Sequence, residues 1–117
     1  MTVKEFLFKT SHLPNDAEIY VGWAENHKTG VFQFGIKQGL SAVRIYDFDD
    51  VKEAYVSSGY NVDKEQFTLG DIRDKWSNVG LDYHLNLHLS GGYGYAYREL
   101  SEVLINENNH ILLLCER

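Results

Sequence analysis

The chain has 117 residues, of which 44% are hydrophobic and 14% aromatic, and this composition excludes an intrinsically disordered protein. Seventeen acidic against 11 basic residues give a net charge of -6, which disfavours direct binding to nucleic acid or to an anionic membrane. We find neither an apolar run long enough to span a bilayer nor a signal-peptide layout, and the lone Cys115 cannot form an internal disulfide. We therefore expect one cytoplasmic domain over residues 1–117.

The first predicted element is a capped helix at the N-terminus. Thr2 and Glu5 have the spacing of a capping box, and an apolar stripe begins with Val3 and Phe6. Pro14 marks the end of this segment, and residues 17–21 then alternate between apolar and polar as a strand does.

The same order of signals returns from Thr68 onward. Thr68 and Asp71 occupy capping positions, Ile72 and Trp76 follow at helical spacing, and Gly80 supplies a stop before another alternating strand.

A six-residue sequence pattern also occurs twice in the chain. Leu-Ser-x-Val-x-Ile occurs at residues 40–45 and again at 100–105, and each copy precedes a polar turn and an apolar strand. The helix and the first strand match at a numbering offset of 66, and the repeated pattern matches at an offset of 60. Shared binary patterning can mimic duplication, so both explanations stay open.

These observations predict an α+β fold. We expect two similar helix-plus-antiparallel-strand units, produced by internal duplication, that pack as one compact domain because each half is small for an independent core. Repeat 1 spans about residues 1–56, a joint spans 57–66, and repeat 2 spans 67–117. A pseudo-two-fold arrangement would make the cleft between the repeats the first place to seek a small ligand.

The first quarter of the chain resembles a loose group of small uncharacterised bacterial and phage proteins. The match rests on Leu13, Pro14, Asp16, Ala17 and Val21, in a capped helix followed by Leu-Pro-x-Asp-Ala and a Val-rich strand. The resemblance implies a phage-encoded protein and carries over no catalytic residue.

A polar row on one predicted strand is the first candidate for chemistry. His84, Asn86 and His88 share one face of residues 83–90, opposite a row of leucines. The spacing of the histidines and the lack of an accompanying ligand motif argue against a metal, and we expect neither a metal nor a cofactor. A solvent-facing row is the structural alternative.

A second enzymatic hypothesis pairs His27 with His84. Residues 27–29 and 84–86 resemble the paired His-x-Thr/Ser motifs of two-histidine phosphoesterases, although Asn86 replaces a hydroxyl residue. In that family the imidazoles act as acid and base.

The main binding hypothesis concerns a tyrosine-rich strand. Tyr93, Tyr95 and Tyr97 should share one face, and with Arg98 they suit a protein or ligand interface. Acidic docking points are expected in the turn that holds Asp47, Asp49 and Asp50, which lacks the glycine and terminal glutamate of a calcium loop.

The sequence therefore favours a non-enzymatic, acidic binding protein. We expect a protein partner. The resemblance suggests that the chain is phage-encoded, and the acidic surface suggests an inhibitor that occludes its partner, for example a host-defence component. The alternatives are a small-ligand or nucleotide-binding protein and a small phosphoesterase. Exposed strand edges would also allow a homodimer.

Overall fold

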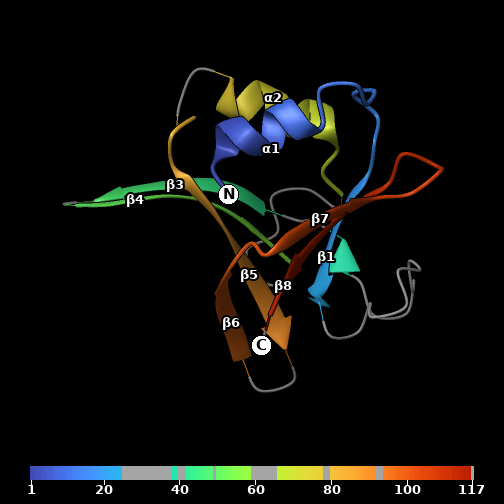
Figure 1. The fold of residues 1–117 in the computed structure, drawn as a ribbon. Helices are drawn as coiled ribbons and strands as arrows, with labels where there is room; N and C mark the ends of the chain where they lie inside the picture. Colours follow the sequence, from blue (N-terminus) through green and yellow to red (C-terminus); the bar gives the residue numbers. More distant parts are fainter. Residues whose placement is uncertain are drawn as a thin grey trace.

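The computed structural model describes residues 1–24, 38–39, 42–48, 50–58, 66–77, 80–91 and 94–116. These residues form helices and two four-stranded sheets, so the predicted α+β class is confirmed. The helices α1 (Val3–Lys9) and α2 (Leu69–Trp76) lie at the same end of the molecule, with the strands below them (Figure 1).

Both sheets combine early and late strands of the chain. Sheet I has the order β3 (Ala42–Phe48), β4 (Val51–Ser57), β5 (His84–Gly91) and β6 (Gly94–Glu99). Sheet II has the order β2 (Gln38–Gly39), β1 (Ile19–Trp23), β8 (Ile111–Cys115) and β7 (Glu102–Ile105).

The central pair of each sheet is parallel, and the outer pairs are antiparallel. β4 pairs in parallel with β5, and β1 pairs in parallel with β8. Each parallel pair joins a strand of the first predicted repeat to a strand of the second. The expected antiparallel hairpins are present, but the two parallel pairs were not anticipated from the sequence.

Both helices begin at the residues that the sequence indicates. The Thr2 hydroxyl accepts a hydrogen bond from the Glu5 backbone N–H at 3.2 Å, and the Glu5 carboxylate accepts one from the Thr2 N–H at 3.4 Å. At α2 the Asp71 carboxylate accepts the Thr68 N–H at 2.9 Å. These bonds satisfy donors that the first turn of a helix leaves unpaired.

Two turns use left-handed backbone conformations. Gly80, the predicted stop after α2, has φ of +70°, and Asn109, in the turn between β7 and β8, has φ of +61°. Glycine and asparagine tolerate positive φ angles better than other residues do, and their presence is therefore typical of such turns.

A single hydrophobic cluster joins the helices to both sheets. Phe6 from α1, Trp76 from α2, Leu87 from β5 and Leu113 from β8 are all buried members of it. Cys115 is buried in β8. Neither described helix is long and apolar enough to cross a membrane.

Candidate aromatic binding face

Among the described side chains, each of the four strands of sheet I places an aromatic ring on the side of the sheet that faces away from the core. The register places Val43, Ala54 and Val56 on the core side together with the leucines of β5. Alternation along the strands then puts the neighbouring residues on the opposite side. We call this outer surface the aromatic face, and its rings belong to Tyr46, Tyr55, His88 and Tyr97.

Three of these rings form a continuous row across β4, β5 and β6. The ring centroids of Tyr55 and His88 are 4.1 Å apart with planes 6° from parallel, and those of His88 and Tyr97 are 4.2 Å apart at 46°. Ring contacts of this kind stabilise by about 0.5–1.5 kcal/mol each beyond the burial of area. The row therefore holds its rings in fixed positions.

A carboxylate lies beneath the row. Glu53 is only 5% exposed, and its Oε1 lies 3.4 Å from Nε2 of His88. Because a carboxylate can only accept, this contact requires the proton of a neutral imidazole to sit on Nε2. Glu53 thus fixes both the tautomer and the orientation of the His88 ring.

Burial keeps the imidazole in its neutral form at neutral pH. Desolvation lowers the pKa of His88 below its usual value, and the nearby Glu53 carboxylate opposes that shift only in part. A neutral ring with its faces against Tyr55 and Tyr97 is suited to stacking.

The outer end of the row is open to solvent. Tyr97 is 51% exposed and Tyr46 is 45% exposed, and apart from Phe8 they are the only large hydrophobic side chains of the described residues to be so exposed. Tyr97 continues the row of Tyr55 and His88, and an exposed ring held in such a row favours a binding surface, whereas an isolated exposed ring needs no explanation.

The tyrosines and the arginine predicted as one cluster lie on different sides of β6. Tyr97 pairs in register with His88 on the aromatic face, whereas Arg98 pairs with the core-facing Leu87. Tyr95 is also in β6, opposite Ser90, but its side chain lies outside the described part of the chain, as does Tyr93 entirely.

Of the predicted acidic docking points, Asp47 lies on the other side of sheet I from the aromatic face. Asp47 alternates with Tyr46 on β3 and accepts a hydrogen bond from the Tyr83 hydroxyl at 2.8 Å. That bond and burial raise the pKa of the Tyr83 phenol. Asp50 is exposed in the β3–β4 turn, and Asp49 falls outside the described residues.

The predicted histidine row is present, but its members have different surroundings. His84 is exposed near the start of β5, whereas Asn86 and His88 are partly buried. His27 lies outside the described residues, so the proposed pairing of His27 with His84 remains a prediction. Within the described chain no three His, Cys, Asp or Glu residues are grouped as metal ligands would be.

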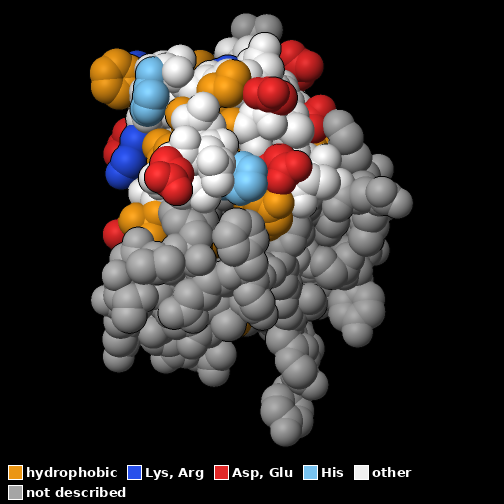
Figure 2. Space-filling view, turned by 90° about the vertical axis from the view of Figure 1, so that its right-hand side faces the viewer, with side chains coloured by type: hydrophobic (Ala, Val, Ile, Leu, Met, Phe, Trp, Pro, Cys, Tyr) orange, Lys and Arg blue, Asp and Glu red, His pale blue; other side chains and the backbone are white. Residues whose placement is uncertain are grey.

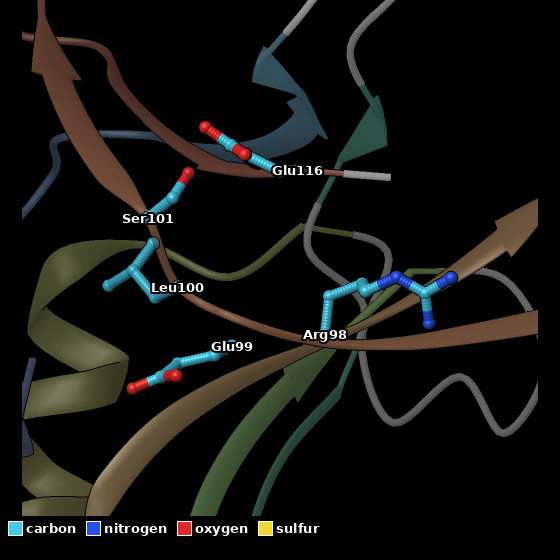
Figure 3. A pocket seen from close by; sticks show the side chains of 5 residues that line it. All are labelled: Arg98, Glu99, Leu100, Ser101 and Glu116. Carbon is cyan, nitrogen blue, oxygen red and sulfur yellow. The ribbon is translucent and has the colours of Figure 1, made fainter.

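A pocket of about 340 Å³ lies where β6 gives way to β7, lined by Arg98, Glu99, Leu100, Ser101 and Glu116. Figure 3 shows the Arg98 side chain extending away from Glu99 and Ser101. Its guanidinium donates to the Tyr97 carbonyl at 2.9 Å. Because the lining groups do not converge, and all come from the second predicted repeat, this pocket does not match the ligand cleft expected between the repeats.

Another histidine and glutamate meet at the margin of sheet II. His110 Nε2 lies 3.7 Å from a carboxylate oxygen of Glu18, and the Tyr20 ring is 5.8 Å from that of His110. Burial and the hydrogen bond to Glu18 raise the pKa of Tyr20 to about 12. This group has one tyrosine and no row of stacked rings.

Figure 2 shows one side of the molecule. Acidic, histidine and hydrophobic side chains are mixed over its described surface, without a broad apolar area among the atoms shown in colour. Comparisons with family models, curated proteins and solved structures found no match to this chain. The aromatic face is therefore the candidate functional site of this chain.

Sequence reasoning identified Tyr97 and His88 but missed Glu53 and Tyr55. Residues 51–56 were interpreted as one more apolar strand, although Glu53, Tyr55 and Ser57 alternate with Ala54 and Val56. That alternation was the available signal for a polar and aromatic outer face. The pairing of β4 with β5 brings Glu53 to His88. No local feature of the amino-acid sequence indicates that pairing.

Proposed function

We propose that this chain is a non-enzymatic binding protein that holds a protein partner on its aromatic face. The observation that carries the proposal is the ordered row of Tyr55, His88 and Tyr97, whose outermost ring is half exposed. Rings that are already fixed lose little conformational entropy when a partner covers them, and tyrosine is enriched at protein interfaces.

Charge suggests what kind of partner would bind. The whole chain has a net charge of -6, and the exposed Glu99 lies on the aromatic face in register with Asn86. A basic partner surface would be attracted by this charge, and the attraction would weaken as salt increases. We therefore propose a partner with a basic docking surface.

Binding of this kind would act by occlusion. A covered partner surface is unavailable to other molecules, which agrees with the inhibitor role expected from the sequence. The phage origin rests on the sequence resemblance alone, the inhibitor role rests on the acidic charge, and the cytoplasmic setting rests on the sequence signals given above.

Site-specific photo-crosslinking tests the proposal. A benzoylphenylalanine replaces Glu99, on the aromatic face, or Phe8, which is 80% exposed on α1 and serves as the matched control. In extract of the producing cells, we expect a discrete adduct from position 99 only, and Tyr97→Ala in the same chain should remove it.

Two results would contradict the proposal. One is an adduct at position 99 that survives Tyr97→Ala in a folded protein. The other is an adduct of the same partner from position 8 with none from position 99, which would place the interface on α1.

A further inference from the structure

The two sheets have the same strand arrangement, with the strands of the first and second halves of the chain exchanged. Sheet I reads β3-β4-β5-β6, and sheet II, taken from its other edge, reads β7-β8-β1-β2. If β1, β2, β3 and β4 are exchanged with β5, β6, β7 and β8 respectively, the strand order of one sheet becomes that of the other. The pairing senses also agree, being antiparallel, parallel and antiparallel in both sheets.

We infer that the chain is a fused two-fold dimer: two copies of one unit, each of which fits a second copy of itself by exchanging hairpins. Unit 1 runs from α1 to β4 and unit 2 from α2 to β8. In each sheet a hairpin from one unit lies in parallel contact with a hairpin from the other.

The register of the strands supports this equivalence position by position. Ala54 pairs with Leu85 across the parallel strands of sheet I, and Ile111 pairs with Ile19 across those of sheet II. The numbering offset is 66 from Ile19 to Leu85 and 57 from Ala54 to Ile111. The same offset of 57 also relates the next inward-facing residues of β4 and β8.

The change of offset has a local cause in the second hairpin. Val43 pairs with Val56 in the first hairpin, and Val103 pairs with Leu113 in the second. The numbering offset is 60 from Val43 to Val103 but 57 from Val56 to Leu113, so the β7–β8 hairpin is shorter by the difference. The difference lies at the outer end of the hairpin, because β3 and β4 pair as far as Phe48 and Val51 whereas β7 and β8 pair only as far as Ile105 and Ile111. A change in length there leaves the pairs nearer the core of both sheets undisturbed.

The helices dock in equivalent ways on the opposite unit. The Val3 N–H donates to the Tyr83 carbonyl at 3.0 Å, and the Leu69 N–H donates to the Ala17 carbonyl at 2.9 Å. Both donors and both acceptors are related by the offset of 66. The next bonds repeat the relation, at 2.8 Å in each case: Lys4 N–H to Leu81 O, and Gly70 N–H to Asn15 O.

Shared binary patterning does not account for this agreement. Patterning determines which segments become helices and strands, and it leaves open which strands pair and in what register. Here the order, the direction, the register and the helix contacts all follow the same exchange. Neither unit alone completes a sheet, since β1 and β4 would each lose their parallel neighbour and present an open edge.

The two units have diverged on their outer faces. Tyr55 and Ser57 of β4 correspond to Leu112 and Leu114 of β8, which point away from the main core cluster yet are buried. The aromatic row on sheet I therefore has no counterpart on sheet II among the described residues. If the proposed function holds, the chain should bind one partner molecule through sheet I.

A circular permutant tests the two-fold equivalence. In the native chain, residues 59–66 connect Ser58 to Phe67, whose equivalents are Cys115 and Met1 by the offsets above. Glu116 and Arg117 plus six added Gly/Ser residues should therefore join Cys115 to Met1 over a connection of the same length. The permuted chain begins at Phe67 and ends at Ser58.

We expect this permutant to be a monomer whose amide NMR spectrum matches that of the native chain away from the new ends. If it folds only with a linker many residues longer, the equivalence of the two connections is wrong. Failure to fold with either linker would count against the inference as well.

A second measurement uses the native order of the chain. A protease site placed in residues 59–65 allows the folded protein to be cut into its two units. We expect the fragments to remain together on size exclusion and to unfold in one transition. Separation of the fragments in native buffer, or two independent unfolding transitions, would overturn the inference whatever the permutant does. Neither test involves the aromatic face, so their failure is distinct from failure of the proposed function.

Discussion

The shared core predicts that a cavity made in one unit destabilises both. Leu113 is fully buried in β8, with Val21 and Val103 beside it in register. Leu113→Ala should reduce the free energy of unfolding by about 3 kcal/mol, within the range for buried leucines. With a urea dependence of about 1.5 kcal/mol per M, the unfolding midpoint should fall by about 2 M.

The two tryptophans allow each unit to be followed separately. Trp23 lies in β1 and Trp76 in α2, so labelling with 5-fluorotryptophan gives one ¹⁹F signal from each unit. Leu113→Ala should shift the urea midpoint of both signals equally. The partly buried Leu104, on the opposite side of β7, provides a control whose replacement by Ala should cause a smaller shift. A midpoint that moves for one tryptophan alone would refute the idea of a shared core.

Three further predictions concern single sites. Thr2→Ala and Asp71→Ala each remove one member of a helix cap. Each should lower the free energy of unfolding by about 1 kcal/mol, measured by thermal or urea unfolding. An unchanged free energy of unfolding would contradict the capping geometry. Burial lowers the pKa of His88 below 6.5, so the unfolded chain takes up this proton first and stability should fall as pH drops below 6.5. His88→Gln should reduce the difference in unfolding free energy between pH 7.5 and pH 5.5, and an undiminished difference would assign it to other groups. Burial raises the pKa of Cys115 to about 11, so Ellman's reagent at pH 8 should label the folded protein slowly and the urea-unfolded protein rapidly; equally fast labelling would contradict the burial.

Local features of the fold were predictable because their signals lie within a few residues. Thr2 and Glu5 satisfy each other's backbone groups across one helical turn, and Gly80 and Asn109 adopt backbone angles that few residues tolerate. The leucines of β5 face the core, as their alternation with polar residues indicated.

Strand pairing was not predictable in the same way. The parallel contact of β4 with β5 joins segments that α2 separates, and an alternating strand carries no local mark of its neighbour. Glu53 and His88 meet only through that contact. The expected grouping of Tyr97 with Arg98 treated neighbours in sequence as neighbours in space, whereas a strand sends them to opposite sides.

The most direct test of the proposed function is the dissociation constant of the crosslinked partner with purified variants. Tyr97→Ala should weaken binding by about 30-fold or more, as expected for a tyrosine that contributes about 2 kcal/mol at the centre of an interface. Phe8→Ala, which removes the most exposed large hydrophobic side chain of the described residues, should leave the dissociation constant unchanged. Equal affinities for the native protein and a folded Tyr97→Ala variant would contradict the assignment of the aromatic face as the docking surface.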